Sequence, residues 1–148
     1  MKIMDLKIKR VRDNDDLALP QYQSEAASGM DLLADIKEKV IIKPGQRHLV
    51  PTGISIEFPI GYEAQVRARS GLAIKKGISL VNGPGTIDAD YRGEIAVILI
   101  NHGTDDFLIS RGDRIAQLVI SPVIQANIIE VDTLLTTTRG EGGFGSTG

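Results

Sequence analysis

Two apolar runs flank one polar segment in the second half of the chain: Ile78-Ser79-Leu80-Val81 and Ile95-Ala96-Val97-Ile98-Leu99-Ile100 lie on either side of Gly85-Thr86-Ile87-Asp88-Ala89-Asp90-Tyr91-Arg92-Gly93. Short runs rich in Ile and Val that are bounded by glycine are typical of β-strands. A turn that only reverses the chain needs Gly, Asn or Asp, and has no need of a tyrosine and Ile87 as well. We therefore interpret residues 78–100 as a β-hairpin equipped for a ligand, with a plain solvated loop as the alternative.

The same alternation of apolar runs and turn residues extends along most of the chain. Turn signals such as Lys43-Pro44-Gly45-Gln46 and Pro59-Ile60-Gly61 recur at intervals of about 8–12 residues, which indicates an all-β sandwich or barrel. The predicted strands are Ile3–Ile8, Met30–Ala34, Val40–Ile42, Arg47–Val50, Ile54–Phe58, Tyr62–Arg67, Ile78–Val81, Glu94–Asn101, Phe107–Ile109, Arg114–Ser121 and Ile128–Val131.

One short helix is predicted, with Ser70 as its N-cap and Gly77 at the C′ position. A serine-capped helix start also suits an anion, because its first backbone amides lack partners. The run Ile95–Ile100 shows no alternation, so we expect both of its faces to be covered. In a domain of this size the second cover often comes from another subunit.

Bulk composition excludes several classes of protein. The 148 residues fit one domain, and the net charge of −2 provides no basic field for nucleic acid. Without cysteine there are no disulfides, thiolate nucleophiles or Cys-ligated zinc, and the two histidines show no ligand spacing. No apolar run is long enough to span a membrane, and the first residues lack the apolar core of a signal peptide. We expect a cytoplasmic protein.

Six of the nine arginines lie between Arg67 and Arg139, and most of these adjoin glycine or serine. Arginine binds phosphate through two parallel hydrogen bonds, and glycine lets backbone amides approach it. A compact anionic ligand is therefore a reasonable expectation, with incidental arginines in solvated turns as the alternative.

The C-terminal end differs in character from the rest. Five of the last ten residues are glycine, yet the segment carries Arg139, Phe144 and the adjacent hydroxyls of Ser146 and Thr147. Such a segment cannot form a core, and a plain linker has no need of an aromatic residue. We predict a β domain over residues 1–135 and a flexible glycine-rich lid over residues 136–148, with a frayed tail as the alternative.

Five polar islands recur between the strands in a fixed order: Ala27-Ser28-Gly29-Met30-Asp31-Leu32, Ala68-Arg69-Ser70-Gly71-Leu72-Ala73, the segment through Gly93, Arg111-Gly112-Asp113-Arg114-Ile115-Ala116-Gln117-Leu118, and the glycine-rich tail. In that order and spacing they resemble the five motifs of the trimeric dUTPase family. The resemblance covers about residues 28–148 and implies a jelly-roll or distorted β-barrel subunit with one short helix. It further implies a homotrimer whose active sites lie between subunits.

The implied reaction is the hydrolysis of dUTP to dUMP and pyrophosphate with Mg²⁺, which keeps uracil out of DNA and supplies dUMP for dTMP synthesis. By the same resemblance, Asp88 orients and deprotonates the attacking water, and Tyr91 packs on the deoxyribose. The backbone from Asn82 through Gly85, Thr86 and Ile87 reads the uracil edge. For Tyr91 the alternative is packing on its own neighbours, and Asp90 is expected to be a structural turn or salt-bridge residue.

The resemblance assigns the phosphates to Arg69, Ser70, Gly71 and Gln117. It also implies that Asp31 supports the metal-binding region, either directly or through hydrogen bonds to other site residues. Gln117 is the one polar residue on a face shared with Ile115 and Val119, so a core glutamine bonded to backbone is the alternative. The remaining substrate contacts are expected from the lid: Phe144 on the uracil, and Arg139, Gly145, Ser146 and Thr147 around the phosphates. Mg²⁺ is expected to be held mainly by triphosphate and water.

Two other functions stay open. A dCTP deaminase-type relative resembles the chain around Gly85-Thr86-Ile87-Asp88, although the second motif and the tail favour a dUTPase. A non-catalytic nucleotide-sensing trimer is the second alternative, against which the presence of Asp88, Tyr91 and Phe144 argues.

Overall fold

The structure, a computed structural model, describes residues 4–147. Within them lie eleven strands and one short helix. The strands are β1 (Lys7–Arg10), β2 (Gly29–Leu33), β3 (Val40–Ile42), β4 (Arg47–Pro51), β5 (Ile54–Glu57), β6 (Tyr62–Arg67), β7 (Ile78–Leu80), β8 (Gly85–Ile87), β9 (Ala96–Asn101), β10 (Phe107–Ile109) and β11 (Arg114–Pro122), with α1 (Ser70–Lys76) between β6 and β7.

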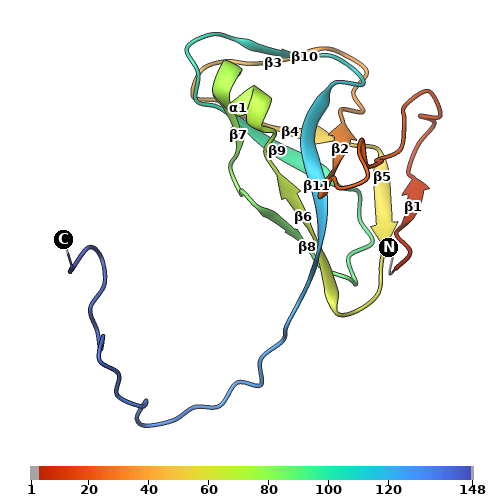
Figure 1. The fold of residues 1–148 in the computed structure, drawn as a ribbon. Coiled ribbons are helices and arrows are strands. Elements are labelled where there is room, and N and C mark those ends of the chain that lie inside the picture. The colour runs from red at the N-terminus through yellow and green to blue at the C-terminus, as the bar shows by residue number, and fades with distance from the viewer. Residues whose placement is uncertain (1–3, 148) are drawn as a thin grey trace.

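The strands form four antiparallel sheets (Figure 1). The largest has the order β2-β11-β6-β8, and a three-stranded sheet has the order β4-β9-β7. Two-stranded ribbons, β1-β5 and β10-β3, complete the molecule. Strands that are distant in sequence lie side by side, as in β2 with β11, which is the arrangement expected of a jelly roll. The predicted all-β class with one short helix is confirmed.

One apolar core lies between the sheets. Leu32, Leu118 and Val66 from the four-stranded sheet and Val97 and Leu99 from the three-stranded sheet belong to the same cluster of buried side chains. Since every second residue of a strand faces inward, short Ile- and Val-rich strands fill this core without long helices.

One face of strand β9 is covered within the chain, and cover of the other face by a second subunit stays a prediction. Val97, Leu99 and Asn101 are fully buried, whereas the alternate residues Ala96, Ile98 and Ile100 are only half-buried. The second face of this apolar strand is therefore partly open in one chain.

The hairpin prediction needs a correction. The apolar flanks pair as expected, with Ile78 opposite Asn101 and Leu80 opposite Leu99. The segment between them, however, crosses to the other sheet, where β8 pairs with β6. The polar segment is thus a connection between two sheets that includes a strand of its own.

The prediction that Ser70 is the helix N-cap is wrong. Ser70 is the first residue of α1, and Arg69 occupies the N-cap position without a side-chain capping hydrogen bond. The extended backbone of Arg69, at the end of the chain segment that leaves β6, sets this boundary. The predicted C-terminus is correct, because Gly77 ends the helix with φ of 69°. A β-carbon there would lie 2.7 Å from the backbone nitrogen of Gly103, so this close approach requires glycine.

Predicted and observed strands agree residue for residue at Val40–Ile42, Tyr62–Arg67 and Phe107–Ile109. The first predicted strand, Ile3–Ile8, is displaced to Lys7–Arg10, and its first residue lies outside the described residues. The predicted strand Ile128–Val131 is absent, since residues 123–147 contain neither helix nor strand and leave the sheets as an extended arm (Figure 1). None of the described helices has the length and apolarity needed to cross a membrane.

Candidate active site

A row of polar side chains crosses the four-stranded sheet. Gln117 on β11 lies opposite Asp31 on β2 and opposite Arg67 on β6. Directly opposed residues of antiparallel strands project from the same face. Asp31 and Gln117, two of the predicted site residues, are therefore neighbours on one face of the sheet.

An ion pair joins the first predicted motif to the second. Arg69 Nε lies 3.2 Å from Asp31 Oδ1, and both side chains are largely shielded from solvent. Arg114 Nη1 lies 3.7 Å from the other oxygen of Asp31. The Asp31 carboxylate thus touches two arginines, and its role includes holding the guanidinium of Arg69 beside the start of α1.

Gln117 is oriented by the backbone that leads to the helix. Its Nε2 donates a hydrogen bond to the carbonyl of Ala68 at 3.0 Å, which is the backbone contact foreseen as the alternative to phosphate binding. The side chain is nonetheless only half-buried. Its amide therefore has a fixed direction and still reaches solvent. The bond to backbone is confirmed, and phosphate binding by Gln117 stays a prediction.

The helix start itself is open. Ser70 and Gly71 are exposed, and a β-carbon on Gly71 would meet nothing within 4 Å. Asp31, Arg69, Ser70, Gly71 and Gln117 form what we call the Asp31–Arg69 cluster. It combines one arginine, an exposed hydroxyl and an amide beside a backbone that a ligand can approach.

The predicted hairpin residues line one cleft of about 180 Å³. Its walls also include Val66 from β6, Leu80 from β7 and the chain from Glu94 to Ile98. Six predicted site residues belong to the lining: Asn82, Gly85, Thr86, Ile87, Asp88 and Tyr91. Six residues that the family resemblance assigns to the site thus line one concave space, which we call the cleft.

Within the cleft, the turn that follows β8 sets the position of Tyr91. The Tyr91 amide donates to the carbonyl of Asp88 at 3.1 Å, and its hydroxyl donates to the carbonyl of Glu94 at 3.0 Å. The ring does pack on its own turn, as the alternative held, but it remains half exposed beside the cleft. The Asp88 carboxylate is exposed, and Asp90 lies in the turn as predicted.

The cleft and the Asp31–Arg69 cluster are built on neighbouring residues of β6. Val66 pairs with Gly85 and lines the cleft, while Arg67 pairs with Gln117 in the polar row. Among the described residues, no side-chain hydrogen bond or ion pair joins the two groups. One chain therefore presents a base-sized cleft and an anion-suited cluster as two separate halves.

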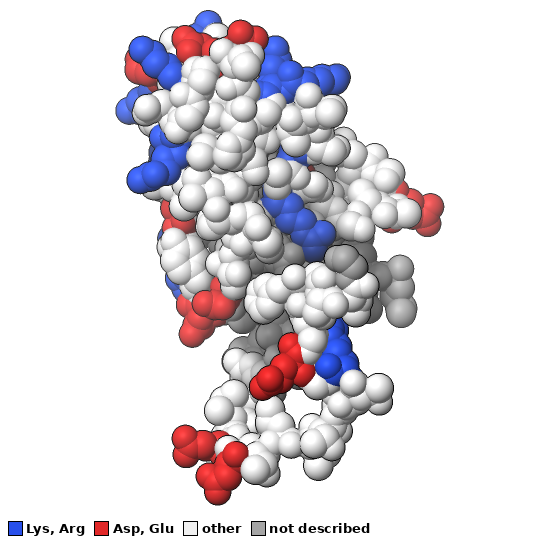
Figure 2. Space-filling model, turned by 90° about the vertical axis from the view of Figure 1, so that its left-hand side faces the viewer, with Lys and Arg blue, Asp and Glu red and all other residues white. Residues whose placement is uncertain are grey.

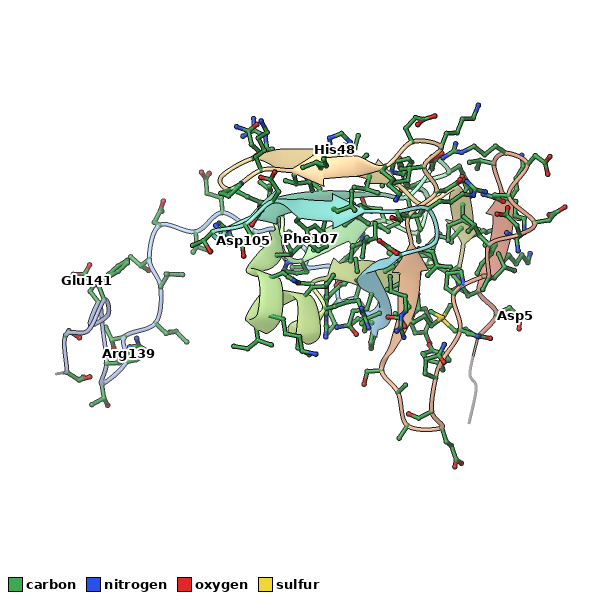
Figure 3. The ribbon with its side chains drawn as sticks, turned by 90° about the horizontal axis from the view of Figure 1, so that it is seen from above. Asp5, His48, Asp105, Phe107, Arg139 and Glu141 are labelled. Atoms are coloured by element: carbon green, nitrogen blue, oxygen red, sulfur yellow. The ribbon has the colours of Figure 1, made fainter. Side chains whose placement is uncertain are left out.

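The predicted lid residues lie far from both halves. The side chains of Arg139 and Glu141 stand on the extended arm, well away from the sheets (Figure 3). Phe144 is fully exposed, and Arg139 donates to the carbonyl of Gly142 within the arm itself. In this structure Arg139, Phe144, Gly145, Ser146 and Thr147 form no part of the cleft.

Sequence reasoning missed Glu94, Val66 and Leu80 as members of the cleft. Leu80 and Val66 are ordinary strand residues, and nothing in their spacing marks them. Glu94 has a partner that is remote in sequence: Arg12 donates to both of its carboxylate oxygens, at 2.6 and 2.8 Å. Only the folded chain brings these two residues together.

One face of the molecule has, among its described residues, no extended patch of side chains with the same charge. In the view of Figure 2, basic and acidic side chains are interspersed and separated by broad uncharged areas. The described residues of that face therefore form no extended basic patch that would attract an anion from a distance.

Comparison with known proteins agrees with this geometry. The sequence model of the dUTPase family matches residues 15–148, which include both halves of the site. The chain belongs to the dUTPase family. The predicted family is therefore confirmed.

Several curated dUTPase-family relatives match along nearly the whole chain. The deoxyuridine 5'-triphosphate nucleotidohydrolase of Thermoanaerobacter sp. (strain X514) is 57% identical over 143 residues, covering 97% of each chain. The protein of the same name from Beijerinckia indica subsp. indica is 58% identical over 143 residues, covering 95% of this chain and 89% of that protein.

Solved dUTPase structures share the fold. A mutant dUTPase of Staphylococcus bacteriophage 80alpha, solved with dUpNHpp, superposes with a TM-score of 0.86 at 24% identity, covering 97% of this chain and 98% of that one. A mutant dUTPase from phage phi11 of S. aureus, described with a coordinated structural Mg(II) ion, gives a TM-score of 0.79 at 20% identity and covers 89% and 99% of the two chains.

Proposed function

We propose that the protein is a dUTP diphosphatase that hydrolyses dUTP to dUMP and pyrophosphate by attack of water on the α-phosphate. The observation that carries this proposal is that six residues to which the family resemblance assigns contacts with the base, the sugar or the attacking water line the cleft. The names of the full-length relatives support it. In a cytoplasmic setting, the activity would keep uracil out of DNA and supply dUMP for dTMP synthesis.

The uracil would be recognised by the backbone of the segment from Asn82 to Ile87. Gly85 and Ile87 are buried, and β8 pairs with β6 on one edge only, so its other edge has main-chain groups available to the base. Backbone donors and acceptors cannot exchange roles. Cytosine has the reversed pattern of hydrogen-bond donors and acceptors, so it would leave buried main-chain groups unpaired. Such a mismatch can give a selectivity of about 10⁴–10⁵ against the wrong base.

The sugar would pack against Tyr91. Because its hydroxyl is bonded to Glu94 and its amide to Asp88, the ring cannot move away freely from the mouth of the cleft. A 2′-hydroxyl would collide with the ring and lose its solvation. This gives the protein a steric preference for deoxyribonucleotides.

The triphosphate would be held by the Asp31–Arg69 cluster of another chain. Arg69 offers a forked donor, and Ser70 and Gly71 offer a hydroxyl and backbone amides. Gln117, held by Ala68, would direct its amide at a phosphate oxygen or at a water. Asp31 would act through Arg69 by fixing the direction of its guanidinium.

Asp88 would position the attacking water and accept its proton as the new bond to phosphorus forms. The carboxylate lies on the cleft wall and is exposed, so water reaches it. A positioned general base contributes about 10²–10⁴-fold to such a reaction.

Mg²⁺ is the proposed cofactor, bound mainly by triphosphate and water. The residues present fit this role. Among the described residues, no group of three His, Cys, Asp or Glu side chains could coordinate a metal ion by itself. The carboxylate of Asp31 already pairs with Arg69 and Arg114. When bound, the ion supplies neutralisation of phosphate charge. The chain itself supplies orientation and proton transfer.

A homotrimer would unite the two halves of the site. The half-buried face of β9, with Ile98 and Ile100, and the exposed apolar residues of the arm, such as Ile124 and Leu135, all need a cover that one chain does not provide. The residues 136–148 of one chain would then close over a neighbouring site, with Phe144 on the uracil and Arg139, Gly145, Ser146 and Thr147 around the phosphates.

A pyrophosphate-release assay on dUTP, dCTP, dTTP and UTP, with and without Mg²⁺, tests the proposal. We expect turnover of dUTP alone, dependent on Mg²⁺, from a species with the mass of a trimer in light scattering. Ammonia release from dCTP would instead identify a deaminase. Tight dUTP binding without turnover would identify a nucleotide sensor, and a stable monomer would exclude the shared site.

A further inference from the structure

A chain of charged contacts runs from the buried interior of the protein to the cleft. Asp35, whose side chain is 3% exposed, accepts hydrogen bonds from Asn14 Nδ2 at 2.8 Å and Arg111 Nη1 at 2.5 Å. Arg12 Nε lies 2.9 Å from the same carboxylate. Asp35 is thus a fixed anchor to which the otherwise exposed segment around Arg12 is attached.

The other end of the Arg12 guanidinium holds Glu94. Nη1 and Nη2 lie 2.6 and 2.8 Å from the two carboxylate oxygens of Glu94, a forked pair in which direction as well as distance is set. Glu94 lines the cleft, and its carbonyl accepts the hydroxyl of Tyr91. Arg12 is therefore two contacts away from the ring beside the cleft.

Gly93, which directly precedes Glu94, makes the position of the Tyr91 ring depend on this backbone. A β-carbon on Gly93 would lie 2.3 Å from the Tyr91 hydroxyl oxygen, so the ring rests directly against the main chain at Gly93 and Glu94. The next residue, Ile95, is already held by backbone bonds to Ile54 and Thr52. Loss of Arg12 would consequently loosen the turn at 89–94 and leave β9 in place.

We propose that Arg12 is a positioning residue for sugar selectivity: by tying Asp35 to Glu94 it holds the Tyr91 ring where a 2′-hydroxyl would project. The inference rests on the proposed function, since it assigns the sugar to Tyr91. Arg12 precedes residues 15–148, the part of the chain that the family model matches.

The test is the ratio of kcat/KM for dUTP to that for UTP in Arg12→Gln. We expect this ratio to fall by at least about tenfold, mainly through faster turnover of UTP. Arg10→Gln is the matched control, because Arg10, the last residue of β1, carries the same charge two residues before Arg12 and contacts Asn14 and Asp15 rather than Glu94. Its ratio should stay within about twofold of the unaltered protein. Should Arg12→Gln fail to fold, Arg12→Lys takes its place in the test, because lysine keeps the positive charge but cannot form the two parallel hydrogen bonds to Glu94.

A double variant tests whether Arg12 acts through the ring. In a Tyr91→Phe background, which lacks the hydroxyl bonded to Glu94, Arg12→Gln should change the ratio little further. An unchanged ratio in the folded Arg12 variants, or an equal fall in the Tyr91→Phe background, would overturn the proposal.

A measurement without substrate separates this proposal from the proposed function. The chain has three tyrosines and no tryptophan, so in a Tyr22→Phe, Tyr62→Phe background the intrinsic fluorescence reports on Tyr91. Iodide should quench it more strongly in Arg12→Gln than in Arg10→Gln. Equal quenching would reject the positioning role, whereas failure of the unaltered protein to cleave dUTP would reject the proposed function.

Discussion

Gly29 and Gln117 are packed so closely that only glycine is possible at position 29 with the present glutamine rotamer. A β-carbon there would lie 2.4 Å from Oε1 of Gln117. The bare backbone of β2 thus creates the space in which the amide points toward Ala68. A residue with no side chain determines the direction of a proposed phosphate ligand.

Gly29→Ala is expected to reduce dUTP turnover by roughly tenfold to a hundredfold. The added methyl group would displace the Gln117 amide, and a small displacement of a group that contacts the substrate lowers the rate strongly. Stability should change little: losing the bond to Ala68 costs about 1 kcal/mol, and alanine in a strand recovers about 0.5–1 kcal/mol relative to glycine. Kinetics and thermal unfolding of the same sample check both statements. In a Gln117→Ala background the Gly29 substitution should have no further effect on turnover, and an additive loss would show that Gly29 acts elsewhere.

Asp88→Asn is expected to lower kcat by about 10²–10⁴-fold while dUTP still binds. The amide keeps the size of the carboxylate on the cleft wall but cannot accept the proton of the attacking water. Single-turnover kinetics together with calorimetric titration of dUTP separate the two quantities. Asp90→Asn, in the same turn but outside the cleft lining, is the matched control. Parallel loss of binding and turnover would make Asp88 a binding residue.

Removal of residues 139–148 is expected to leave the melting temperature unchanged and to lower dUTP turnover by about 10²-fold, because the closing aromatic and phosphate contacts are lost. The described hydrogen bonds of this segment, such as Arg139 to Gly142, are local, so the sheets do not depend on it. Phe144→Ala in the full chain should reproduce part of the loss through a higher KM. Full activity of the shortened protein would eliminate the lid.

Acid is expected to unfold the protein partly through Asp35. Burial alone would raise its pKa, but hydrogen bonds from Asn14 and Arg111 and the charges of Arg12 and Arg111 outweigh burial, and the pKa is lowered. A lowered folded-state pKa stabilises the protein above the unfolded value of about 3.9, and this contribution disappears as the pH falls through the lower folded value.

Asp35→Asn should accordingly destabilise the fold at pH 7 by about 3–5 kcal/mol, since the arginines lose a buried partner, and the difference from the unaltered protein should narrow below pH 4. Denaturant unfolding at a series of pH values measures this. Asp16→Asn is the control, because Asp16 meets the same Arg111 at an exposed position and should matter far less. A difference independent of pH would show that the charge of Asp35 is not responsible.

The candidate site could be predicted to the extent that it depends on local chemistry. Carboxylate, tyrosine and glycine within a few residues of one another, as at Asp88, Tyr91 and Gly85, are necessarily close in space whatever the fold. Their convergence on the cleft follows from that proximity. Glu94 was not predicted because its importance depends on its contact with Arg12, which is remote in sequence. The prediction of Ser70 as N-cap was wrong because the extended backbone of Arg69 determines the first residue of α1.

What the sequence by itself determined is the conformation of each short segment. Turn glycines and alternating apolar residues specify where a strand begins and ends, as at Val40–Ile42 and Tyr62–Arg67, because backbone sterics and side-chain period act within a few residues. Only the tertiary structure decided which strands pair: β8 joins β6 across to the other sheet, and Ile128–Val131 forms no strand in one chain. Strand pairing needs hydrogen-bond partners and apolar cover from distant residues, and those exist only once the chain has folded.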